Sequence, residues 1–283
     1  MPKLFNEFSE VKDEIEKKTK KIIYKYRDFN NSYHRRLLTH QELWFSHPKE
    51  LNDPYDIRLD LRFKYNEINK PEFFEILKLF APLRYPHVHP DSRDFRILCE
   101  NQYQLIKQDP KKWMDERSSE LRESNLYDKV GVLSLTFNPL NLKMWEQYSN
   151  NNTGFCAGFA TMTLAEHLMP RGLGFVKYKK RPPIYSFFDR KRIERDEMYL
   201  KGIQWKIESE FRFVTPSITS ISDRAVTFPK DYLKEVIVGY LISKEDLEFI
   251  KKVLVSEYDS NVKLYKIIVS PISQKIKRIE LDY

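Results

Sequence analysis

The chain has 283 residues, and its 49 lysines and arginines outnumber its 41 aspartates and glutamates, which gives a formal net charge of +8. No apolar run approaches the roughly eighteen residues of a membrane span, and the start lacks the apolar centre of a targeting signal, so we expect neither. The two cysteines lack metal-ligand spacing and indicate buried thiols in a reducing cytoplasm. The excess of cations favours a nucleotide or nucleic acid partner.

The first half of the sequence predicts a short sheet region followed by helices. An amphipathic, charged helix is expected in an N-terminal arm over residues 1–21, and a strand follows at residues 22–27. A short helix is predicted at residues 33–39 and a strand at residues 42–46. Proline-punctuated helical patterns then predict an all-helical insertion over residues 68–129.

The centre of the sequence predicts a helix between two strands. GVLSLTF is typical of a strand, and Asn138 followed by Pro139 predicts the cap and first turn of a helix. A run of three asparagines ends that helix, because asparagine tolerates the left-handed conformation. The next strand is FCAGFA, in which Gly158 predicts a close approach to the backbone.

The rest of the chain alternates between strand and helix patterns up to the C-terminus. Strands before and after a helical block predict an α+β fold with a mixed or antiparallel central sheet. We expect a single domain of this kind over residues 22–283, with the helical insertion inside it. No pattern indicates the oligomeric state.

The segment WKIESEFRF carries the most informative chemistry. As a strand with a period of two, it places Glu208, Glu210 and Arg212 on one face. Neighbouring carboxylates repel, and the arginine or a bound cation would relieve that repulsion. One interpretation is the solvated face of an edge strand. The other is an active-site strand that meets the positive charge of a reacting sugar.

Two further strands carry polar residues in a recognisable order. Tyr24, Tyr26 and Arg27 end the first strand, and Ser134 and Thr136 share one face of a later strand. An arginine, then Ser-x-Thr, then Glu-x-Glu resembles the arginine-serine-glutamate class of ADP-ribosyltransferases. In that class the arginine contacts the phosphates of NAD, the serine strand shapes the nicotinamide pocket and the second glutamate is catalytic.

This resemblance implies a set of roles in an NAD-using transferase. The catalytic group would comprise Glu210, with Glu208 and Tyr24 beside it. The residues expected to bind the cofactor, including aromatic walls from the central helix, are Arg27, Tyr26, Ser134, Thr136, Trp145, Tyr148 and Arg212. In the default interpretation, Trp145 and Tyr148 are ordinary core aromatics.

The turn NDPYD supports a different chemistry. Asp53 and Asp56 bracket a proline and a tyrosine, which favours an ordered turn with exposed carboxylates. Together with Glu208 and Glu210 they could hold magnesium, as in a metal-dependent nuclease. The alternative is an Asx turn whose aspartates bond their own backbone. A third hypothesis is a non-enzymatic nucleic-acid or protein-binding module in which the Glu-Arg face is a structural lattice.

Several motifs together resemble one protein family. YKYR, LWFS with NDPYD, MWEQYSNNNTGFCAGF, KGIQWKIESEFR, and LKEVIVG with SKED follow one another between Ile22 and Val253. They are similar to the bacterial family catalogued as domain of unknown function 2971. Glu146 and Gln147 depart from the family pattern, which usually has a histidine before the tyrosine. The resemblance implies a bacterial cytoplasmic protein of no established reaction, in a setting compatible with an effector of toxin or phage-defence systems.

Overall fold

The computed structural model describes residues 21–53, 55–57, 62–64, 69–85, 87–123, 128–168, 172–186, 189–215, 218–270, 272 and 275–283. The helix expected within residues 1–21 lies outside this part of the chain. The chain divides into two compact units. The first comprises Met1–Leu51, Tyr127–Tyr178 and Ile203–Tyr283, and the second comprises Asn52–Leu126 and Lys179–Gly202.

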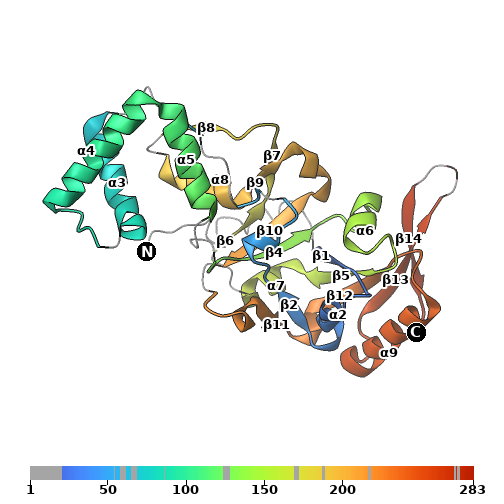
Figure 1. The fold of residues 1–283 in the computed structure, drawn as a ribbon. Helices are drawn as coiled ribbons and strands as arrows, with labels where there is room; N and C mark the ends of the chain where they lie inside the picture. The colour runs from blue at the N-terminus through green and yellow to red at the C-terminus, as the bar shows by residue number, and fades with distance from the viewer. Residues whose placement is uncertain are drawn as a thin grey trace. The chain divides into compact units, whose positions relative to one another are not determined.

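A mixed sheet forms the centre of the first unit (Figure 1). Its strands lie in the order β14 (Ile276–Leu281), β13 (Lys263–Val269), β12 (Leu233–Val238), β5 (Phe155–Ala160), β1 (Ile22–Arg27), β4 (Gly131–Thr136), β10 (Glu210–Thr215) and β6 (Gly172–Phe175). Neighbours pair antiparallel except β12 and β13, which are parallel and have α9 (Lys244–Tyr258) between them in the chain. The predicted α+β fold with a mixed sheet is confirmed.

The two faces of this sheet carry different cores. Ile23 belongs to the larger cluster, which α2 (Ser32–Thr39), α7 (Thr161–Leu168) and α9 complete. Tyr24 and Tyr26 belong to a smaller cluster, which α6 (Leu142–Tyr148) completes on the other face. Because side chains alternate along a strand, odd-numbered residues of β1 face the larger core and even-numbered residues face α6.

Helix α6 begins later than the sequence predicts. Its N-cap is Asn141, whose Oδ1 accepts from the backbone N–H of Met144. Asn138 instead accepts from the N–H of Leu140 in a local turn, so the predicted cap at Asn138 is wrong. The asparagine stop is confirmed: Asn150, Asn151 and Asn152, which follow the C-cap Ser149, have φ of 49°, 52° and 69°.

The second unit contains the helices expected in the insertion. They are α3 (Lys70–Arg84), α4 (Arg93–Gln108) and α5 (Pro110–Glu123), and α8 (Arg190–Tyr199) belongs to the same unit. Phe73, Ile106, Trp113 and Met114 form a buried cluster between the first three. Strands β3 (Arg62–Phe63) and β8 (Ile184–Tyr185) pair parallel to each other.

The remaining strands are short. In the first unit, β2 (Glu42–Trp44) pairs antiparallel with β11 (Ala225–Thr227). Strands β7 (Lys177–Lys179) and β9 (Leu200–Gly202) follow β6 and α8 in the chain. Among the described helices, none has the length and apolar character needed to cross a bilayer.

Candidate functional site

The Glu-x-Glu segment is half turn and half strand. Residues Ile203–Glu208 form a 3-10 helix, Ser209 has a left-handed φ of 45°, and the strand begins at Glu210. The prediction that Glu208 lies on the strand is therefore wrong, because the turn at Ser209 breaks the alternation. β10 lies between β4 and β6, and each glutamate is 4% exposed. The solvated edge-strand interpretation is also wrong.

Glu210 is held by an arginine two residues along the same face of β10. Arg212 donates from Nε to Oε1 of Glu210 at 2.8 Å and from a terminal nitrogen to Oε2 at 2.9 Å. Arg212 is fully buried. This bidentate geometry fixes the plane of the carboxylate.

The turn before Glu210 is fastened by neighbouring elements. Tyr148 of α6 donates its hydroxyl to Glu208, and Asn141, the N-cap of α6, donates its side-chain amide to the carbonyl of Ile207 at 2.7 Å. On β4, Thr136 donates to the carbonyl of Ser209 at 3.3 Å. Glu208 therefore anchors this turn to α6, and the anchored turn fixes the position of Glu210.

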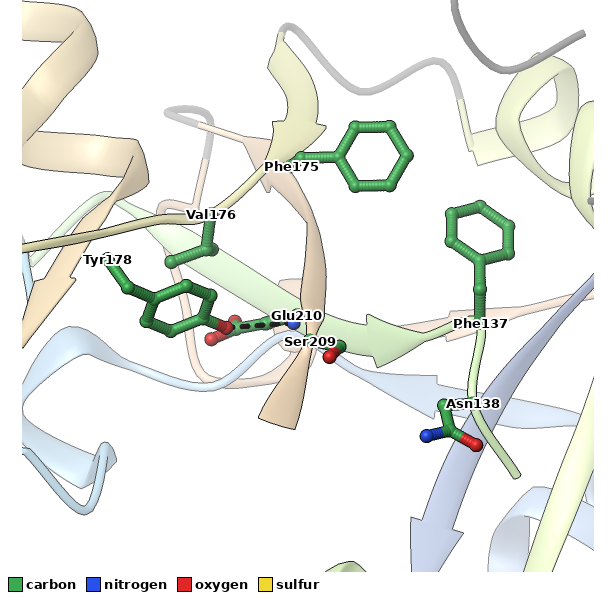
Figure 2. A pocket seen from close by; sticks show the side chains of 7 residues that line it. All are labelled: Phe137, Asn138, Phe175, Val176, Tyr178, Ser209 and Glu210. Atoms are coloured by element: carbon green, nitrogen blue, oxygen red, sulfur yellow. Dashed lines mark hydrogen bonds between the residues drawn. The ribbon is translucent and has the colours of Figure 1, made fainter. Parts of the chain in front are cut away.

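A cavity of about 330 Å³ opens beside Glu210. It lies where three strands meet, after the ends of β4 and β6 and at the start of β10. Figure 2 shows its lining residues, which are Phe137, Asn138, Phe175, Val176, Tyr178, Ser209 and Glu210. The hydroxyl of Tyr178 accepts the backbone N–H of Glu210 at 2.9 Å. The cavity thus combines aromatic rings with an amide, hydroxyls and an oriented carboxylate.

The serine strand lies directly beside the glutamate strand. Thr136 pairs with Glu210 in the register of β4 and β10, and Ser134 pairs with Arg212. The sequence order of these two strands therefore does bring their polar residues together. Ser134 and Thr136 do not line the cavity themselves, because they lie inside the sheet and the cavity opens at its end.

Tyr24 shares the face of Glu210 but reaches toward a different acid. It pairs with Thr136 on one side and with Gly158 on the other, and its hydroxyl donates to Glu235 at 2.8 Å. Arg278 also binds Glu235. Burial, then the bond to Glu235, raises the pKa of Tyr24. Tyr24 is therefore part of a second acid-arginine cluster.

Gly158 permits this second cluster to form. A Cβ at Gly158 would lie 2.8 Å from the ring of Tyr24 and 2.8 Å from Cγ of Glu235. The close approach predicted for this glycine is therefore confirmed, and the groups that approach are an aromatic ring and a side chain from the two neighbouring strands.

The aromatic residues of α6 and β1 pack the smaller core. Trp145 lies edge-on to Tyr26, with ring centroids 5.1 Å apart. Tyr26 donates to the carbonyl of Asn138 at 2.9 Å, and Trp145 donates to that of Pro139 at 2.8 Å. Burial raises the pKa of Tyr26. These rings support the segment that carries Asn138 into the cavity wall, and they do not line the cavity themselves.

Arg27 does not meet the other predicted residues. Its partner in the sheet is Phe155, which belongs to the larger core, so Arg27 faces away from Glu210. It also lies three residues beyond Tyr24, about 10 Å along the strand. The expected convergence of Arg27 with Ser134 and Glu210 is therefore wrong. Arg27 points to the opposite face of the sheet, and it lies too far along β1 from the level of Glu210.

The NDPYD turn is buried, contrary to the expectation of exposed carboxylates. Asp53 is 3% exposed and Asp56 is 1% exposed. Asp53 accepts the backbone N–H of Tyr55 at 3.0 Å, as expected for an Asx turn, and Asp56 pairs with Lys201 at 3.2 Å. Within the described ranges no group of three or more His, Cys, Asp or Glu side chains is placed to hold a metal ion.

The sequence interpretation missed most of the cavity wall. Phe137 and Asn138 directly follow β4, Val176 directly follows β6, and Tyr178 lies in β7, the short strand after it. Their position just after a strand end was the available signal, since strand ends are where loops gather side chains around a site. The pairing of these two strand ends with β10 was not visible in the sequence.

One family comparison bears on this site. Residues 144–213 match the family model described as "Protein of unknown function (DUF2971)". Neither the curated proteins nor the solved structures contain a match to the chain. The matched residues begin in α6 and end in β10, so they include the tyrosine that anchors the turn and the Glu210–Arg212 pair. Over residues 144–213 the chain thus matches the DUF2971 family that its motifs predicted.

Proposed function

We propose that the cavity binds the nucleoside end of NAD and that Glu210 is the catalytic carboxylate of an ADP-ribosyltransferase-like enzyme. The observation that carries this proposal is the oriented, buried carboxylate of Glu210 on the wall of the cavity, held in two hydrogen bonds by Arg212. At about 330 Å³ the cavity is near the lower end of small-molecule pockets, which suits a nucleoside-sized group.

The chemistry requires stabilisation of positive charge on a sugar. When the bond between ribose and nicotinamide breaks, the electron pair leaves with nicotinamide and positive charge develops on the ribose, whose anomeric carbon then bonds to the oxygen of water or to an acceptor nucleophile, with loss of a proton from that nucleophile. A fixed carboxylate stabilises that charge because it needs no reorganisation during the step. Glu210 lies on the wall of the cavity, and the rings of Phe137 and Phe175 offer apolar surface to a planar base (Figure 2).

Arg27 makes no contact with the cofactor in this reaction, because it faces the other side of the sheet. Tyr24 and Trp145 act in it only as core residues of the face that supports the cavity. Contacts to the phosphates of NAD must therefore come from other groups at the cavity mouth.

The test compares two buried, arginine-paired glutamates on one face of the sheet. NAD turnover is followed by release of nicotinamide in the parent, in Glu210→Gln and in Glu235→Gln. Glu235 is the matched control because it also pairs with an arginine and is 3% exposed. We expect Glu210→Gln to lose about a hundredfold or more of the turnover, since removal of an electrostatic group costs about that much. Glu235→Gln should keep it.

Stability must be separated from catalysis in this test. Breaking a buried ion pair costs about 3–5 kcal/mol in either variant, so both are assayed well below their melting temperatures. NAD should still raise the melting temperature of Glu210→Gln, because the cavity remains. Equal turnover in parent and Glu210→Gln, or no NAD-induced shift in any of the three, would discard the proposal.

A further inference from the structure

Asn138 is fixed on the wall of the cavity by three hydrogen bonds. Its backbone N–H donates to Oγ1 of Thr136 at 3.2 Å, and its carbonyl accepts the hydroxyl of Tyr26 at 2.9 Å. In its side chain, Oδ1 accepts the backbone N–H of Leu140 at 3.1 Å. Because an amide nitrogen cannot accept that bond, the orientation of the side-chain amide follows from it, and the NH2 group is the end that remains as a donor.

The NH2 group of Asn138 is available to a ligand in the cavity. It has no acceptor among the residues that the structure describes, and Asn138 is an exposed residue of the cavity wall (Figure 2). Thr136 holds this residue in relation to the acid, because the hydroxyl that accepts from Asn138 also donates to the carbonyl of Ser209. One side chain therefore ties the segment of the donor to the turn that precedes Glu210, which prepares both groups for binding.

The apolar part of the wall is a packed cluster of phenylalanines. The ring centroids of Phe137 and Phe175 are 5.7 Å apart, and both rings pack on the buried Phe211, at 5.4 Å and 4.8 Å. Rings at these separations touch, so a ligand ring lies against them and not between them. The lining residues carry one formal charge, the negative charge of Glu210. An aromatic wall with a carboxylate favours a flat ring that bears positive charge.

We propose that the nicotinamide ring of NAD, and not its adenine, occupies this cavity, and that Asn138 selects it by donating to the carboxamide oxygen. This inference rests on the proposed function. The nicotinamide ring of NAD is a cation, whereas adenine is neutral, so the aromatic wall and Glu210 favour nicotinamide. An asparagine that recognises adenine uses both ends of its amide. The oxygen of Asn138 is engaged by Leu140, and its remaining donor suits a single carbonyl oxygen.

Calorimetric titration with three dinucleotides that share the same adenosine half tests this assignment. They are NAD, its acetylpyridine analogue, which keeps the carbonyl oxygen, and its pyridine analogue, which lacks the carboxamide. The titrations use full-length Glu210→Gln, in which we expect NAD to bind without rapid turnover. NAD and the acetylpyridine analogue should bind about tenfold more tightly than the pyridine analogue, the effect of one hydrogen bond in the cavity.

Adding Asn138→Asp removes the donor and keeps an oxygen that accepts the N–H of Leu140, so the local turn is retained. This change should abolish the tenfold preference for NAD over the pyridine analogue. The added charge acts on two dinucleotides with equally charged rings, so the ratio of their affinities reports the hydrogen bond and not the charge. Asn261→Asp adds the same charge at an exposed residue before β13 and should leave the preference unchanged.

The outcomes separate this inference from the proposed reaction. Equal affinity of the three dinucleotides would show that the shared adenosine half occupies the cavity, and a preference that survives Asn138→Asp would show that another group binds the carboxamide. Either result overturns the inference, while nicotinamide release by the parent and by Glu210→Gln decides the reaction separately. If the parent releases no nicotinamide but the preference depends on Asn138, the reaction falls and the nicotinamide site stands. Absence of dinucleotide binding would overturn both.

Discussion

His34 makes the stability of the protein sensitive to mild acid. Burial, followed by the positive charges of Arg27 and Lys25, lowers its folded pKa to about 4, below the ordinary value of 6.5. As the pH falls from about 6.5 toward 4, the unfolded chain takes up a proton that the native ring does not, so the free energy of unfolding decreases. Denaturant unfolding at pH 7 and pH 4.5 should show a smaller decrease for His34→Phe than for the parent. An identical decrease in both proteins would contradict the assigned environment of His34.

Single residues also show where sequence reasoning succeeded and where it stopped. The position of Arg27 opposite Tyr24 and Tyr26 follows from parity along the strand, so the sequence already contained that information. The departure of Glu208 from the strand did not follow, because it depends on a left-handed serine, and serine has no strong preference for that conformation. The pairing of Glu210 with Arg212 was accessible from spacing alone.

The start of helix α6 also depends on tertiary contacts that local sequence patterns do not reveal. Both Asn138 and Asn141 are suitable caps by local rules. Asn141 is the cap because its side-chain amide also donates a hydrogen bond to the carbonyl of Ile207, a residue far from Asn141 in the sequence. Local patterns therefore predicted that a helix exists here and that asparagines end it, while tertiary contacts decided where it begins.

The cap of α6 should contribute measurably to stability. Asn141→Ala removes the cap and the bond to Ile207, for an expected loss of about 2 kcal/mol in the free energy of unfolding. Asn138→Ala is the matched control, because its side chain accepts from a neighbouring N–H at an exposed position, and it should cost about half as much or less. Urea unfolding of both variants measures the difference. Equal losses would show that Asn141 does not link α6 to the turn before Glu210.

For the whole molecule, the fold class followed from strand patterns on both sides of the helical block. The association of residues 179–202 with residues 52–126 in one compact unit did not, since it joins segments far apart in the sequence. The order of strands in the sheet was equally inaccessible, because the sequence gives no direct sign of which strand ends meet. The cavity wall depends on that order.

The proposed reaction predicts an effect on the host cell. An enzyme that consumes NAD should lower the NAD content of bacteria that express it and slow their growth. Cells expressing Glu210→Gln at the same protein level should grow normally and keep their NAD. Nucleotide extraction with enzymatic quantification of NAD measures this, and growth arrest by both proteins with unchanged NAD would assign the toxicity to another cause.

The chain uses its seven glycines in an unusual way. None of them has a positive φ in the described structure, whereas asparagine, serine, aspartate, glutamine and isoleucine occupy left-handed positions. At Gly154 and Gly239 an added Cβ would lie 2.2 Å and 1.9 Å from a backbone oxygen. Glycine therefore occurs here where two backbone segments pack too closely for a Cβ atom. In a mutational library, alanine should be tolerated poorly at Gly154 and Gly239, whereas glycine should be accepted at the left-handed asparagines.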